Sequence, residues 1–294
     1  MKRAGEIAGD NALGRAFDKH LEETRVHERR VRERLEALGD EPSSLKDAAG
    51  AAGAWPMLAF AASQPDSPGK LAAHAYSYEH MEEAAYALLR RLAERSGDAE
   101  TARLAEEIGN EERVMGEHLE SEFDLAADLA LEDVPAGKLP ETLTTYLRDT
   151  HAIKGQAVEL LDSAAGTVDD HELSQDLTVH LGESRVQRDA LRDLLKDRGA
   201  RPSTVKDAAL RAGGLNLAAF FSAQPDATTK LAAFTYAFVH LEIASYELLR
   251  RVASRADDPP ATTAAAAFLE EEHDAAGKIA ASWDRPDTPL GVAS

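Results

Sequence analysis

The chain has 294 residues, with 53 Asp and Glu against 33 Lys and Arg, and a formal net charge of −20. This charge disfavours nucleic acid and anionic membrane surfaces as partners. The absence of cysteine excludes disulfides, thiolate zinc sites and iron–sulfur clusters, which leaves carboxylate and imidazole as metal ligands.

The sequence contains a long internal repeat. Residues from about 16 to 120 recur 160 positions later without a gap, so that His20-Leu21 matches His180-Leu181 and Gln64-Pro65-Asp66 matches Gln224-Pro225-Asp226. A register kept over so long a stretch is not expected by chance. A period of this length is the size of a small domain and not of a solenoid repeat.

Apolar residues spaced three and four apart predict long helices throughout the chain. In the second copy these helices span 140–162, 171–197, 226–255 and 261–282, with a shorter helical piece at 203–222. The first copy contains counterparts of the last three long helices only, because the counterpart of 140–162 would precede residue 1.

Four long amphipathic helices in a unit predict a four-helix bundle. We therefore expect an all-α chain of two ferritin-like up-down bundles in tandem, the first lacking its first helix. The linker Asp133-Val134-Pro135-Ala136-Gly137 separates residues 1–134 from residues 135–294. An internal pseudo-dimer of the two bundles, or a homodimer that lends the missing helix, would complete the assembly.

The sequence also carries a prediction of location. The basic start of the chain is not followed by an apolar segment of the secretory kind. The longest apolar run, at 48–62, contains Pro56 and is too short to span a bilayer. These features predict a cytoplasmic protein without a membrane partner.

Polar side chains interrupt the apolar stripes near the middle of the predicted helices. Several converging carboxylates in one core layer would repel one another without a cation, and a buried carboxylate is costly unless it is paired or bound to metal. Dinuclear carboxylate bundles use inward Glu residues and Glu-x-x-His pairs in this way. In the first copy the side chains concerned are His20, Glu23, His27, Glu79, Glu82, Glu111 and Glu112.

The second copy keeps only part of this pattern. Val239 stands in the place of Glu79 and Gln187 in the place of His27, while Glu242 matches Glu82. Lys154 lies on the apolar stripe of the helix predicted at 140–162. We hypothesise that its ammonium supplies the missing positive charge by pairing with a carboxylate, from among Glu183, Glu242 and Glu272.

The motifs His20-Leu21-Glu22-Glu23-Thr24 and Glu79-His80-Met81-Glu82 with Tyr86 resemble those of the YciE/YciF-type ferritin-like bacterial stress proteins. Glu111-Glu112 also fits, and the second copy repeats the motifs in part. The resemblance implies ferritin-like topology, a role in stress and a dinuclear site for iron or manganese. Its metal ligands would be Glu23, His27, Glu79, Glu82 and Glu112.

Neither copy carries the family's complete ligand set, because Lys154 stands where an inward glutamate is usual. Two functions therefore remain open. One is a stress-associated structural or interaction protein with a degenerate metal site. The other is a di-iron or di-manganese carboxylate protein with oxidase-like or peroxide-scavenging activity. The sequence leaves open whether the chain is an enzyme.

His20 and His180 are interpreted as core histidines that hydrogen-bond between helices, and His80 and His240 as packing or interface residues.

Overall fold

The computed structural model describes residues 4–9, 11–41, 67–204 and 227–283, and the regular structure within them is helical. The apolar run at 48–62 lies outside the described residues, as does nearly all of the helical piece predicted at 203–222. The helices are α1 (Ala4–Ala8), α2 (Ala12–Ala37), α4 (Ser67–Ser96), α5 (Ala99–Ser121), α6 (Phe123–Leu131), α7 (Leu139–Thr167), α8 (His171–Asp197), α10 (Ala227–Arg255) and α11 (Pro259–Trp283).

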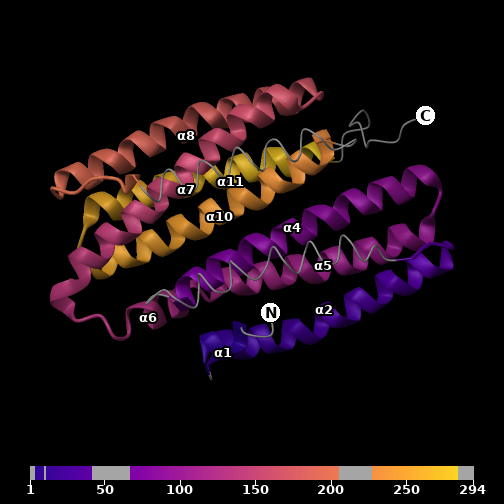
Figure 1. Ribbon diagram of the computed structural model, residues 1–294, viewed down its shortest axis with the longest axis horizontal. Coiled ribbons are helices and arrows are strands. Elements are labelled where there is room, and N and C mark those ends of the chain that lie inside the picture. Colours follow the sequence, from indigo (N-terminus) through magenta and orange to yellow (C-terminus); the bar gives the residue numbers. More distant parts are fainter. Residues whose placement is uncertain (1–3, 10, 42–66, 205–226, 284–294) are drawn as a thin grey trace.

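The helices form two units that lie side by side (Figure 1). In the second unit α7 packs against α8 and α10, and α11 packs against the same two helices, which closes a four-helix bundle. In the first unit α5 packs against α4 and α2, and α1 contacts α2 and α4. The prediction of an all-α chain that forms two helical bundles is confirmed. Among the described residues, none of the helices combines the length and apolar character needed to cross a bilayer.

The ends of the helices follow from local sequence. Asp98 and Asp170 accept hydrogen bonds from the backbone N–H groups of Thr101 and Leu173, which satisfies a donor in the first turn of α5 and of α8. Gly97 ends α4 at a φ of 75°, a conformation that glycine adopts without a steric penalty. Its counterpart after α10 is Asp257, at a φ of 53°. The repeat therefore preserves the backbone turn although the residue has changed.

The short helix α1 takes the place of the last turn of α7. Ala8 is the counterpart of Val168 in the repeat, and both side chains are buried. Helix α1 packs on α2 and α4 just as α7 packs on α8 and α10. The first unit thus has the end of its first helix, and the described residues contain no more of it.

The two units meet through α4 and α10, which lie next to each other in Figure 1. The rings of His80 and His240 stack with centroids 3.6 Å apart, and the Ser77 hydroxyl donates to the Ala237 carbonyl over 2.7 Å. Each pair joins equivalent positions of the repeat. The contact is therefore self-complementary, like the interface of a twofold dimer. His80 and His240 are interface residues, as the sequence predicted.

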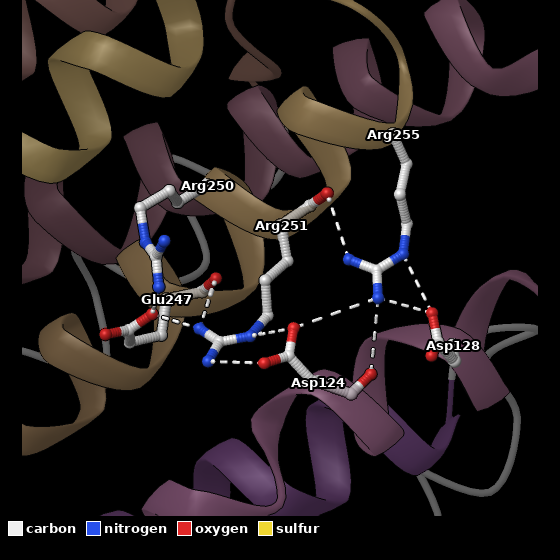
Figure 2. Close-up of polar contacts among 6 residues, drawn as sticks. All are labelled: Asp124, Asp128, Glu247, Arg250, Arg251 and Arg255. Atoms are coloured by element: carbon white, nitrogen blue, oxygen red, sulfur yellow. Dashed lines mark hydrogen bonds and ion pairs between the residues drawn. The ribbon is translucent and has the colours of Figure 1, made fainter.

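Helix α6, which the sequence analysis did not predict, packs against both α4 and α10. Figure 2 shows its carboxylates facing the arginines of α10. Arg251 Nε lies 2.9 Å from Asp124, and Arg255 Nε lies 2.8 Å from Asp128. Glu247 on α10 also pairs with Arg251. These ion pairs link the end of the first unit to the second.

The domain boundary placed after residue 134 falls between α6 and the 3-10 turn Ala136–Lys138, and it stays a prediction.

Candidate metal centre

Three helices of the first unit bring four potential metal ligands together. His20 comes from α2, Glu79 and Glu82 from α4, and Glu112 from α5. One ligand atom from each residue lies within 4.8 Å of all the others. His20 Nε2 is 2.9 Å from a Glu79 oxygen and 3.6 Å from a Glu112 oxygen. The two glutamates of α4 share one face because residues three apart on a helix are neighbours.

The cluster is buried and lacks hydrogen bonds at the atoms that face inward. Glu79 is 0% exposed, and His20 and Glu112 are each 1% exposed. Within the described residues, His20 Nε2, both Glu79 oxygens and one oxygen each of Glu82 and Glu112 have no hydrogen bond of acceptable geometry. Buried polar atoms are normally satisfied, so this concentration indicates a site for a bound group.

The electrostatics of the cluster are those of buried carboxyl groups that lie close to one another. Burial raises the pKa of Glu82 to about 8, and the carboxylates of Glu112 and Glu79 add to the effect. Burial also raises the pKa of Glu79 to about 7, against the opposing influence of His20. Burial lowers the pKa of His20, but the carboxylates of Glu79 and Glu112 outweigh it, so that the pKa is raised. Burial and the mutual repulsion of the carboxylates therefore favour the protonated forms of Glu79 and Glu82, and His20 offsets this only in part.

His27 lies two turns along α2 from His20, outside the cluster of four. Its Nδ1 is 2.8 Å from Glu112 Oε1 and its Nε2 is 2.6 Å from Glu111 Oε2. Burial lowers the pKa of His27, but these two carboxylates outweigh it and raise the pKa to about 9. Because both ring nitrogens are engaged, His27 holds and orients Glu112. Its role as a metal ligand stays a prediction.

Glu23 lies at the edge of the cluster. Its side chain is 38% exposed, 2.9 Å from Lys19 Nζ and 3.6 Å from His20 Nδ1. The structure therefore brings three of the five predicted ligands together, namely Glu79, Glu82 and Glu112. It adds His20, which the sequence analysis interpreted as a core histidine. The roles of these residues as metal ligands stay predictions.

The second unit repeats the cluster but adds a lysine at its centre. His180, Glu242 and Glu272 are the counterparts of His20, Glu82 and Glu112, and their ligand atoms also lie within 4.8 Å of one another. Here Lys154 from α7 reaches the centre. Its Nζ is 2.5 Å from Glu242 Oε1 and 2.7 Å from Glu272 Oε1.

The lysine is completely enclosed by its partners. Lys154 is 1% exposed, and its Nζ also lies 5.5 Å from the centre of the Tyr246 ring. Burial lowers the pKa of Lys154, but Glu242 and Glu272 outweigh it and raise the pKa. The hypothesis of a lysine pairing with the core carboxylates thus agrees with the geometry. Of the three partners suggested, Glu183 instead pairs with His180, at 3.6 Å.

Gln187 replaces His27 in the second unit and keeps one of its two contacts, the one to the counterpart of Glu111, without a charge. Its amide nitrogen donates to Glu271 over 2.7 Å, and its amide oxygen accepts from the Tyr246 hydroxyl over 2.9 Å. Val239, in the place of Glu79, removes one carboxylate. The second cluster therefore combines one imidazole and two carboxylates with one ammonium, whereas the first combines one imidazole with three carboxylates.

The family described as a domain of unknown function, DUF892, matches residues 1–131 and again residues 138–285. The chain belongs to this family. The two matched segments are consistent with the tandem arrangement seen in Figure 1, one segment for each unit. The match supports the ferritin-like part of the resemblance. The narrower likeness to the YciE/YciF-type proteins stays a prediction.

Proposed function

We propose that the first unit binds one divalent transition metal ion, iron or manganese, between His20, Glu79, Glu82 and Glu112. The observation that supports this most is the set of buried ligand atoms that lack hydrogen bonds. Three carboxylates and one imidazole suit these metals. Dinuclear bundles draw six inward residues from four helices. The first unit offers four residues from three helices, which favours a single ion over the dinuclear site implied by the resemblance.

The surrounding residues define what such a centre can do. His27 orients Glu112 from outside, the arrangement by which neighbouring groups tune a metal ligand. Glu82 is partly exposed and Tyr78, one turn before it on α4, is 45% exposed, so this is the side on which the cluster lies nearest to solvent. Iron or manganese held there would supply redox chemistry with oxygen or peroxide. This is our second candidate function, oxidase-like or peroxide-scavenging activity.

We assign the second unit a structural role, because Lys154 already provides the positive charge that its carboxylates require. The whole chain is then a stress-associated protein in which one half carries a metal and the other supports it. Its association with stress and its cytoplasmic location rest on the sequence and stay predictions.

Metal titration tests the proposal. Chelator-treated protein should bind one Mn²⁺ per chain, measured by isothermal titration or by metal analysis after gel filtration. Glu112→Gln should weaken binding at least tenfold, because changes even around a metal site cost about 10–100-fold in affinity. Glu106→Gln, an exposed position on the same helix, is the matched control and should bind like the wild type. No bound metal, or equal affinity in Glu112→Gln, would contradict the proposal.

Metal affinity should also rise with pH. The pKa of Glu79 is about 7 and that of Glu82 about 8, so both carry protons at pH 6 that a metal ion must displace. Each displaced proton changes the affinity about tenfold per pH unit below its pKa. Manganese titrations at pH 6, 7 and 8 should show affinity increasing at each step. A flat profile would show that these carboxyl groups are not the ligands.

A further inference from the structure

One face of the first unit is open where the second unit is closed. Along α4, residues spaced alternately four and three positions apart form a stripe on one side of the helix. Tyr78 is 45% exposed and Leu92 is 38% exposed, whereas their counterparts Phe238 and Val252 are 7% and 0% exposed. The stripe consists of Tyr78, Glu82, Ala85, Leu89 and Leu92, and all five counterparts on α10 are buried.

Helix α2 contributes the other side of this open face. Val31 and Leu35 are partly exposed, whereas their counterparts Leu191 and Leu195 are both 0% exposed. Leu21 and Thr24 differ from their buried counterparts in the same way. The two helices thus present a partly exposed, largely apolar face with Glu82 near its middle. We call it the α2–α4 face.

Helix α7 covers the matching face of the second unit and shows what the α2–α4 face is shaped to hold. It packs along α8 and α10, its Thr150 hydroxyl lies 3.1 Å from that of Ser245, and Lys154 reaches the carboxylates. In the first unit α1 covers only the end of the face. Among the described helices α5 also contacts both α2 and α4, and it corresponds to α11 and not to α7.

We propose that the α2–α4 face binds an amphipathic helix of a partner that presents a lysine in the middle of its apolar face. Charge complementarity selects this occupant, because Lys154 reaches the equivalent carboxylates of the second unit from this side, and the first unit adds a further carboxylate, Glu79, to the cluster. A second copy packed face to face would bring two such carboxylate clusters together, which is unfavourable. Recognition would follow the helix-in-groove mode, with apolar anchors at helical spacing.

The proposal also gives the metal centre a form of regulation, and in this part it rests on the proposed function. In the second unit the lysine nitrogen occupies the space between the two carboxylates that a cation would otherwise take. A lysine delivered to the first unit would meet the same carboxylates that we assign to the metal. Helix docking and metal loading should therefore exclude each other.

A synthetic peptide with the sequence of residues 139–167 is the probe. Labelled peptide is titrated by fluorescence anisotropy into the chelator-treated full chain, where we expect one peptide per chain with micromolar affinity. Lys154→Glu in the peptide should weaken binding at least tenfold. Leu92→Asp in the protein should do the same, while Val186→Asp, on an exposed face of the second unit, should not.

The outcomes separate docking from metal binding. No binding at millimolar peptide, or equal binding to the Leu92→Asp protein, would overturn the proposal. So would a wild-type dimer in sedimentation that Leu92→Asp dissociates, since a second copy would then occupy the α2–α4 face. Saturating Mn²⁺ should weaken peptide binding at least tenfold. If protein shown to carry the metal binds the peptide as tightly as metal-free protein does, the claim that lysine and metal compete for the same carboxylates would be overturned. Peptide binding without any metal uptake would overturn the proposed function alone.

Discussion

Replacing Lys154 with methionine should lower the free energy of unfolding by about 3–5 kcal/mol, the cost of removing one partner from a buried ion pair. Methionine preserves the length and apolar stem of the side chain, so little packing is lost. What disappears is the ammonium that lies 2.5 Å from Glu242 and 2.7 Å from Glu272. Two carboxyl groups are then left buried without a cation, and each must ionise at a high cost or bind a proton.

The effect of the substitution should depend on pH. Burial and Glu272 raise the pKa of Glu242 to about 7 even against the opposing charge of Lys154. Without that charge the pKa in the folded state rises further above its unfolded value. A group of this kind stabilises the folded state at low pH, and the stability is lost as the pH rises through the folded pKa. The variant should therefore lose more stability at pH 8 than at pH 6.

Urea denaturation of wild type and variant at the two pH values measures this difference. Lys138→Met is the matched control, because Lys138 is 65% exposed and its pair with Glu141 should contribute less than about 1 kcal/mol. Adding Glu242→Gln to Lys154→Met should recover part of the loss. An effect of Lys154→Met no larger than that of the control would show that the buried pair does not support the second unit.

Replacing Lys154 with glutamate should convert the second unit into a metal site. The variant would combine one more carboxylate with His180, Glu242 and Glu272, which gives the same ligand types as the first cluster. Three buried carboxylates repel one another strongly, so folding of this unit should become dependent on metal. Metal analysis should give two Mn²⁺ per chain in place of one, and chelator should lower the melting temperature far more than in the wild type.

Lys154→Gln is the control for this conversion, because it removes the ammonium without adding a carboxylate. It should stay below two Mn²⁺ per chain at concentrations that saturate the glutamate variant. If Lys154→Glu does not fold even with metal, Lys154→Met is used in its place. In that variant a second ion should still bind weakly between His180, Glu242 and Glu272. A stoichiometry that stays at one in every Lys154 variant would contradict the idea that the lysine blocks a cation site.

The sequence predicted the helices well because the apolar stripes are long and the repeat presents each of them twice. The helix predicted at 171–197 has the same bounds as α8, and that predicted at 261–282 lies within α11. The inward position of Lys154 was also predictable, since a charged residue on an apolar stripe must meet a partner. The short helices α1 and α6 were not predicted, because neither is long enough to show a clear periodicity.

The ligand set was harder to predict than the fold. His20, Glu23 and His27 all lie near one face of α2, and spacing alone cannot tell which of them points to the centre. The residue that points to the centre depends on how α2 is rotated about its axis relative to α4 and α5. In the structure this rotation turns Glu23 towards solvent and places His27 in hydrogen-bonding contact with Glu111 and Glu112. The one sequence signal for His20 was its repetition as His180, which any core residue would share.

The two units thus show two solutions to one physical problem, the charge of buried carboxylates. The second unit uses the ammonium of Lys154 from its own chain, and we propose that the first binds a metal cation from outside. The self-complementary contact of α4 with α10 joins these two halves. Gly97 and Asp257 show that the repeat preserves a turn although the residue has changed, so the repeat maintains the frame while the centres diverge.

Anomalous X-ray scattering from wild-type crystals soaked in Mn²⁺ tests this difference most directly. The account predicts one strong peak in the first unit, within bonding distance of His20, Glu79, Glu82 and Glu112. It predicts no peak in the second unit, with the Lys154 nitrogen seen between Glu242 and Glu272. A peak in the second unit, or none in the first at saturating Mn²⁺, would contradict it.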